Sequence, residues 1–186
     1  MSGWRHPDPA RGLPRQPEDE AGRAPTDDLA EAAPGRRARP EPSLKGRALR
    51  LLSMREHSRL ELERKLGQYE TREGELAEAL DALSARGFIS DERVADSLLH
   101  RRSAKLGTSR IKAELQAKGL DEAVVREAVE QLRGTELERA REVWRRKFGQ
   151  PPADAAERAK QMRFLAARGF SGETARRVIA GADEEN

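Results

Sequence analysis

The sequence predicts an all-α protein of three tandem, helix-turn-helix-like three-helix repeats, stacked into an elongated, curved rod. The chain has 186 residues, of which 37% are charged and only 4% are aromatic. Its apolar residues are mostly Leu, Ala and Val, which suit helix stripes better than a two-sheet core. A short phrase also recurs at separations of 53 and 50 residues, which indicates a helical-repeat array. The three copies are Glu61-Leu62-x-x-Lys65, Glu114-Leu115-x-x-Lys118 and, more loosely, Phe164-Leu165-x-x-Arg168.

The N-terminal segment, residues 1–42, has a different composition from the rest. It holds eight of the ten prolines and carries seven basic and eight acidic side chains, with few apolar residues to bury. Such a segment cannot offset the entropy cost of ordering its backbone. We therefore predict a disordered tail over residues 1–42.

The first repeat is predicted at residues 43–89. Apolar residues at helical spacing indicate its first helix over about residues 44–55. Ser58 and Glu61 have the spacing of a capping box, which predicts the start of the second helix. The third helix is predicted over residues 73–86.

The second repeat is predicted at residues 90–134 and follows the same order of helices. Ser90 is the expected N-cap of its first helix. Gly107 marks the break before a short second helix, which Gly119 ends. Asp121 is the expected cap of the third helix.

The third repeat is predicted at residues 135–182. Thr135 and Glu138 have the spacing of another capping box, and Ser171 is expected to begin the last helix. The middle helix is expected to bury a stripe made of Ala155, Ala159, Met162 and Ala166.

Three aromatic residues are predicted to pack in the core. Trp144 shares a helical stripe with Leu137 and Phe148, which favours packing over base stacking, although three cations follow it directly. Phe88 and Phe170 each follow a glycine at a helix end and are expected to fill the core between units.

Several kinds of chemistry find no support in the sequence. The absence of cysteine excludes disulfides and thiolate metal sites. No paired histidines, phosphate-binding glycine loop or catalytic triad is apparent, so we predict no enzyme, no metal and no cofactor. His57 is expected to pack at a helix entry, and Asp91 and Glu92 to favour their own helix N-terminus. Because no apolar run approaches the length of a membrane span, we expect a cytoplasmic protein.

Basic residues are concentrated on and around the predicted middle helices. Between residues 93 and 118 seven cations stand against two acids, a balance that suits a polyanion or an acidic protein groove. Short middle helices that follow a turn also resemble the second half of a helix-turn-helix motif, which leaves direct DNA binding open. The candidate contacts to a partner or to DNA are Arg59, Lys65, Arg102, Lys105, Arg110, Lys112, Lys118, Arg145, Arg146 and Lys147.

Three stretches of the chain resemble the RecX family, regulators of the RecA recombinase. ALRLLSMREHSRLELERKL at 48–66 is similar to the opening signature of that family. GFISDERVA at 87–95 resembles its second landmark, with Val94 in place of the usual aromatic residue. Arg102, Gly107 and IKAELQAKG at 111–119 match the third landmark. The resemblance covers about residues 44–180 and is weakest in the third repeat.

The resemblance implies three three-helix repeats in a crescent that binds along the groove of a RecA filament on single-stranded DNA. It further implies an inhibitor of the recombinase's ATPase, strand-exchange and co-protease activities. Separately, we expect a monomer that makes weak direct contact with DNA. Two other hypotheses stay open beside it. One is a protein that binds DNA directly, and the other is a general helical adaptor.

Overall fold

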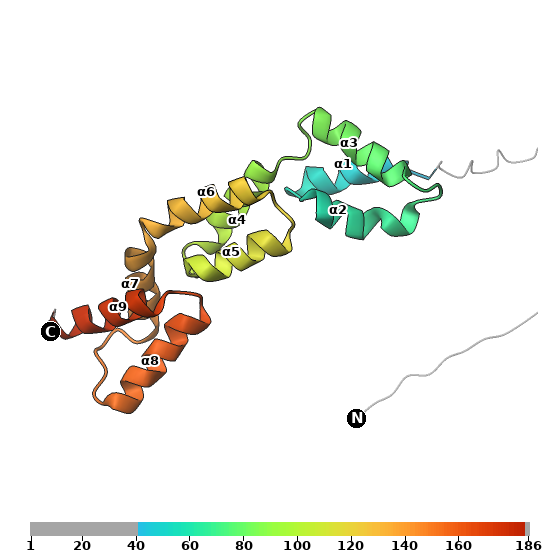
Figure 1. The fold of residues 1–186 in the computed structure, drawn as a ribbon. Helices are drawn as coiled ribbons and strands as arrows, with labels where there is room; N and C mark the ends of the chain where they lie inside the picture. Colours follow the sequence, from blue (N-terminus) through green and yellow to red (C-terminus); the bar gives the residue numbers. More distant parts are fainter. Residues whose placement is uncertain (1–40, 185–186) are drawn as a thin grey trace, which may run out of the picture. The chain divides into compact units, whose positions relative to one another are not determined.

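The structure, a computed structural model, describes residues 41–184, so almost all of the predicted tail lies outside the described residues. The described residues contain nine α-helices, one 3₁₀ turn and no strand, which confirms the all-α prediction (Figure 1). The helices are α1 (Leu44–Met54), α2 (Arg59–Leu66), α3 (Glu75–Ala85), α4 (Asp91–Arg102), α5 (Thr108–Ala117), α6 (Glu122–Arg133), α7 (Glu136–Lys147), α8 (Ala155–Ala167) and α9 (Gly172–Glu184). The 3₁₀ turn η1 (Gly67–Tyr69) follows α2 directly.

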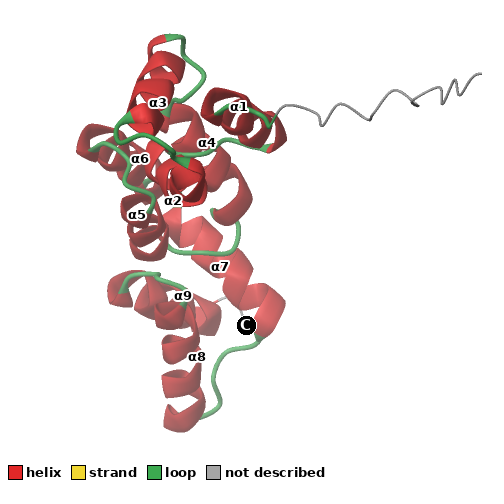
Figure 2. Ribbon diagram, turned by 90° about the vertical axis from the view of Figure 1, so that its right-hand side faces the viewer, coloured by secondary structure: helices red, strands yellow, loops and turns green. Residues whose placement is uncertain are grey.

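The helices fall into three groups of three, and each group buries its own apolar cluster. We call α1–α3, α4–α6 and α7–α9 the first, second and third repeats (Figure 2). The first cluster includes Leu62, Leu80 and Leu83, all fully buried. The second is built around Ile111 and Leu115, and the third around Leu165 and Ile179. The predicted boundaries of the repeats and the predicted rod shape stay predictions.

Side-chain caps explain where most of the helices begin. The Ser58 hydroxyl accepts a hydrogen bond from Glu61 N at 3.2 Å, and the Glu61 carboxylate accepts one from Ser58 N at 3.1 Å. This reciprocal pair confirms the predicted capping box of α2. Ser90 caps α4 and Asp121 caps α6, as predicted. The Ser171 hydroxyl accepts from Thr174 N at 3.0 Å at the start of α9.

The capping box predicted at Thr135 is wrong. Thr135 has φ −110° and ψ 2°, outside the extended region that an N-cap needs, and its side chain makes no capping bond to the backbone of α7. Its hydroxyl instead donates to Leu132 O and accepts from Arg139 Nε. The start of α7 is therefore shaped by a contact with the side chain of Arg139.

Two predictions about buried residues are also wrong. Helix α8 buries Leu165 and Gln161, whereas Ala155 and Ala166 are exposed, so its inward face lies on a different stripe. Phe88 is 46% exposed and fills no core.

The other aromatic predictions and His57 agree with the structure. Phe170 and Trp144 are buried in the cluster of the third repeat, so Phe170 is a core residue as predicted but packs within its own repeat rather than between units. The indole Nε1 of Trp144 donates to Gln161 Oε1 at 2.7 Å, which explains why a glutamine is buried there. His57 is buried beside the α2 cap, where burial lowers the pKa of its imidazole.

Candidate partner-binding surface on the middle helices

The middle helices of the three repeats meet end to end, in the reverse of chain order. At the end of α8, Arg168 O accepts a hydrogen bond from Gly107 N at 2.9 Å, just before α5 begins. Gly169 O accepts from both the amide and the hydroxyl of Ser109, at 3.2 Å and 2.6 Å. These bonds satisfy carbonyl groups of one helix end with donors from the start of the next.

The α5–α2 contact is built from side chains. The Ser58 hydroxyl, which caps α2, donates to Lys118 O at 2.6 Å. The Lys118 ammonium donates to Glu61 Oε1 at 2.7 Å. The C-terminal end of α5 therefore lies against the N-terminal end of α2, as the end of α8 lies against the start of α5.

Glycines permit the close approach at both contacts. A Cβ atom on Gly107 would lie 2.2 Å from the backbone of Gly169 and Phe170. Gly169 and Gly119 both have positive φ, at 86° and 69°, and a Cβ on either would lie within 3 Å of the preceding repeat. A Cβ atom on Gly119 would collide with the side chain of Leu60.

We call the succession α8, α5, α2 the middle-helix row. At each contact the negative C-terminal end of one helix dipole meets the positive N-terminal end of the next. The dipoles therefore point the same way along the row. Among the residues that the structure describes, the row joins all three repeats.

The carboxylates of the row are all engaged within the protein. Glu61 accepts hydrogen bonds from Arg55 and Lys118, and Glu63 pairs with Arg59 at 2.9 Å. Glu114 pairs with Arg102 at 3.4 Å, and Glu157 accepts from the amide of Ala153 at 2.9 Å. No acid of these three helices is left free within residues 41–184.

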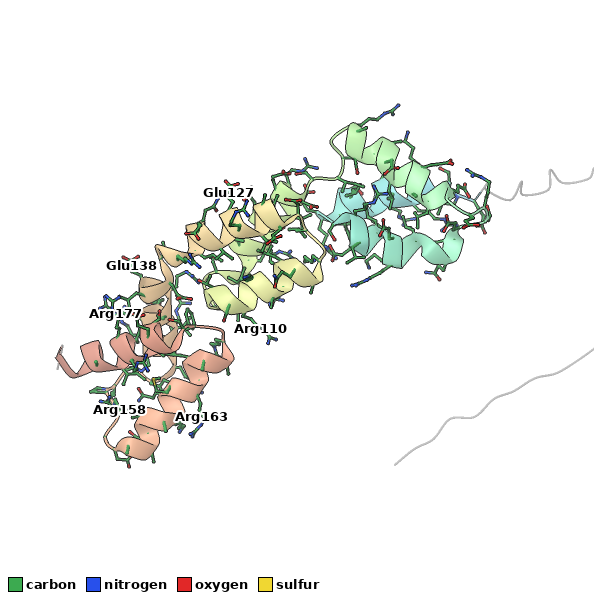
Figure 3. All side chains as sticks on the ribbon, in the orientation of Figure 1. Arg110, Glu127, Glu138, Arg158, Arg163 and Arg177 are labelled. Atoms are coloured by element: carbon green, nitrogen blue, oxygen red, sulfur yellow. The ribbon has the colours of Figure 1, made fainter. Side chains whose placement is uncertain are left out.

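Several cations of the row, by contrast, are exposed, and their side chains make no ion pair or hydrogen bond with the described residues. We call these six the row cations: Arg64, Lys65, Arg110, Lys112, Lys160 and Arg163. Figure 3 shows Arg110 and Arg163 extending from α5 and α8 away from the ribbon. Helix α6 differs, because Glu122 and Glu127 are exposed on it beside Arg126. The row thus presents more positive than negative charge.

The ten predicted contact residues divide into paired and free cations. Five are exposed and free. Lys65, Arg110 and Lys112 lie on the row, Lys105 follows α4, and Lys147 lies at the end of α7. The other five are held by carboxylates of the chain: Arg59, Arg102, Lys118, Arg145 and Arg146. Arg145 and Arg146 share one carboxylate, that of Glu142. The contact role of all ten residues stays a prediction.

Glu61 has the most perturbed pKa of the surface. Burial would raise the pKa of its carboxyl, but hydrogen bonds from Arg55 and Lys118 outweigh this effect and lower the pKa to about 2. The Glu61 side chain is only 17% exposed and that of Lys118 only 19%. Lys118 therefore serves the contact between repeats, and a partner would have to displace Glu61 to reach its ammonium group.

Two residues that join the second and third repeats were missed by the sequence reasoning. The Arg139 guanidinium donates to Leu106 O at 2.6 Å and to Ser103 O at 3.0 Å, and burial lowers its pKa. Glu136 accepts from Thr108 N at 2.9 Å, at the first residue of α5. No local pattern distinguishes these two residues from the many other charged residues of α7.

No group of three or more metal-ligating side chains occurs among residues 41–184. None of the described helices is long and apolar enough to cross a membrane.

Comparisons with known proteins give a consistent result. The family model of the second three-helix domain of RecX matches residues 90–129, and that of the third matches residues 135–179. "Regulatory protein RecX" of Leptothrix cholodnii is 53% identical over 148 residues, which cover 80% of this chain and 94% of the relative. The protein of the same name from Ralstonia pickettii is 49% identical, covering 76% and 89%.

Solved structures share the fold. The crystal structure of RecX from Lactobacillus salivarius aligns with a TM-score of 0.64 at 23% identity, covering 76% of this chain and 95% of that one. A second crystal structure, of a regulatory protein RecX, aligns with a TM-score of 0.61 at 24% identity, covering 73% and 70%.

Proposed function

This chain belongs to the RecX family of regulatory proteins, and on that premise we propose that it binds the RecA filament on single-stranded DNA and inhibits the recombinase. The inhibited activities are the ATPase, strand-exchange and co-protease activities of the recombinase. We propose further that the protein acts as a monomer in the cytoplasm and that it modulates the recombinase without catalysing a reaction of its own.

The middle-helix row supports this proposal. Three helices joined end to end carry the six row cations, while every carboxylate on them is engaged internally. Such an arrangement suits a long, repetitive, negatively charged target better than a compact ligand. A protein filament wound on DNA has those properties.

The row cations also keep direct DNA binding open as a second function. Exposed Lys and Arg side chains contact phosphates without reading sequence, and such binding weakens steeply as the salt concentration rises. The two functions differ in what the protein requires. An inhibitor of the filament needs the assembled recombinase, whereas a DNA-binding protein competes with the recombinase for the DNA.

The deciding experiment measures the ATPase rate of the host's own recombinase on saturating single-stranded DNA, with increasing amounts of this protein. We expect a dose-dependent fall in rate that additional DNA does not relieve. A fall that excess DNA abolishes would instead support simple competition for DNA. No effect at all would contradict the proposed function.

A charge-reversal variant tests whether the row is the surface responsible. The variant replaces Arg110, Lys112, Lys160 and Arg163 by Glu, and we expect its inhibitory potency to fall by about tenfold or more. The matched control replaces four exposed cations outside the row, Arg86, Arg141, Arg176 and Arg177, by Glu, with the same change in net charge. The control should stay within about threefold of the original protein, because none of its four cations belongs to the row. Equal losses in both variants would show that total charge matters rather than the row.

A further inference from the structure

The first repeat contains a groove that the row does not account for. The groove measures about 370 Å³ and lies between α1, the end of α2 and η1. Its apolar lining comes from Leu51, Met54, Leu66 and Tyr69. Met54 is 70% exposed and Tyr69 is 42% exposed, so two of the three large apolar side chains exposed among the described residues meet here. Exposed apolar side chains gathered in this way mark an interaction site.

The rim of the groove is positively charged. Arg50 and Lys65 are exposed and make no ion pair or hydrogen bond through their side chains with the described residues. Arg47 is held in place by Glu41 at 2.9 Å and by Pro42 O at 3.0 Å. No acidic residue among residues 41–184 lines the groove. A ligand that fills it therefore needs an apolar side chain together with negative charge beside it.

The apolar side chains favour a peptide over a nucleic acid. The guanidinium of Arg47 lies 4.0 Å from the centre of the Tyr69 ring and so covers one face on which a base would stack. The other apolar groups are aliphatic. Met54 is flexible and polarisable, properties typical of surfaces that adapt to the side chains of a protein partner.

We propose that this groove binds an acidic peptide segment of a protein partner. One large apolar side chain of the segment enters between Met54 and Tyr69, and flanking carboxylates pair with Arg50 and Lys65. The volume matches an anchor of one or two side chains rather than a whole helix. The proposal does not depend on the partner being the recombinase filament. A peptide-binding test without the recombinase therefore tests the groove separately from the proposed inhibition.

The test titrates the full chain into fluorescein-labelled short peptides and follows fluorescence anisotropy. One peptide has two central Leu residues flanked by Asp and Glu, and its partner peptide has Ser in place of both Leu residues. An oligodeoxythymidylate of the same charge serves as the nucleic-acid probe. We expect the Leu peptide to bind about tenfold or more tightly than the Ser peptide, because only the Leu side chain buries apolar surface.

Variants locate the binding. Met54→Ser and the pair Arg50→Glu with Lys65→Glu should each weaken binding of the Leu peptide, by about fivefold or more. Met54 is highly exposed, so its replacement should leave the thermal unfolding midpoint unchanged. The control pair, Arg126→Glu with Arg176→Glu, makes the same change in charge on α6 and α9 and should alter binding by less than about twofold.

Three results would overturn the proposal. Equal affinity for the Leu and Ser peptides would mean that charge alone drives binding. No detectable binding of the Leu peptide would mean that the groove takes no such segment. Tighter binding of the oligonucleotide, weakened by Met54→Ser, would assign the groove to nucleic acid.

Discussion

The two contacts between successive repeats use different chemistry. The second and third repeats are joined by hydrogen bonds to main-chain groups. Gly107 and Ser109 donate to the carbonyls of residues 168 and 169, Arg139 donates to Leu106 O, and Glu136 accepts from Thr108 N. The first and second repeats are joined mainly through side chains, with Lys118 held by Ser58 and Glu61 and a further ion pair between Arg93 and Glu56 at 2.9 Å. The same arrangement of helix ends is thus stabilised in one place by hydrogen bonds to the backbone and in the other by ion pairs between side chains.

This difference determines how each contact should respond to solution conditions. Main-chain hydrogen bonds in a packed contact depend little on pH or salt, whereas ion pairs weaken with salt and with protonation of the carboxylate. We therefore expect the first repeat to separate from its neighbour under acidic or high-salt conditions that leave the second and third repeats joined.

The largest effect should come from Gly107→Ala. The new Cβ would lie 2.2 Å from the backbone of residues 169 and 170, which cannot move without breaking the hydrogen bonds of the contact. We expect a loss of about 3 kcal/mol in the free energy of unfolding, measured by urea denaturation. Amide hydrogen exchange should show the loss at Ser109 and Phe170.

A matched control for this change is Gly134→Ala. Gly134 has φ −60°, and no atom lies within 4 Å of the place that a Cβ atom would take, so alanine fits there. Its stability should change by less than about 1 kcal/mol, in the stabilising direction. Equal destabilisation by both substitutions would contradict the close-approach explanation.

Arg139→Met should have the next largest effect. The guanidinium donates to the carbonyls of Ser103, Leu106 and Leu132, which would lose their partner in a partly buried place. We expect a loss of about 2 kcal/mol in the free energy of unfolding. Arg139→Lys should recover only part of it, because an ammonium group cannot reach all three carbonyls. Full recovery by lysine would show that charge alone matters at this position.

Glu61→Gln tests the charged contact. The pKa of Glu61 is lowered from 4.5 to about 2, so its stabilising contribution is complete above pH 4.5 and is lost as the pH falls towards 2. We expect the substitution to cost about 1 kcal/mol at neutral pH and to reduce the loss of stability between those two pH values. A double-mutant cycle with Lys118→Met measures the coupling directly, and additive effects would mean that the pair contributes nothing.

Glu56→Gln should have the smallest effect. The side chains of Arg93 and Glu56 are 46% and 30% exposed, so solvent screens their interaction. We expect less than about 0.5 kcal/mol, disappearing in high salt. A loss as large as that of Glu61→Gln would place the main ionic contact between the repeats here instead.

The elements that were predictable from sequence are those fixed by near neighbours. Ser58 and Glu61 satisfy each other's backbone within one helical turn, so their spacing alone predicts the cap that the structure contains. Thr135 has a similar spacing to Glu138, but its hydroxyl is engaged with Arg139, which itself reaches across to the second repeat. The spacing of neighbouring residues cannot predict that distant contact.

The same limit applies to the candidate surface. Arg102 and Lys118 read as free cations in sequence, yet their carboxylate partners, Glu114 and Glu61, lie 12 and 57 residues away. Arg110 and Lys112 read the same way and are free in the structure. Composition and period predicted the basic character of the middle helices. Arg59, Arg145 and Arg146 have a carboxylate partner three or four residues away, whereas the pairing of Arg102 and Lys118 depends on the folded arrangement.

The middle-helix row also limits how the chain length can vary. Helix α5 contacts another helix at both ends, so inserting or deleting a residue within it would shift one of the two contacts by about 100° of helical rotation. Helix α8 makes its contact only at its C-terminal end, and α2 only at its N-terminal end. Insertions near residue 150 or residue 70 should therefore be tolerated, while the ten residues of α5 set a fixed spacing between the first and third repeats.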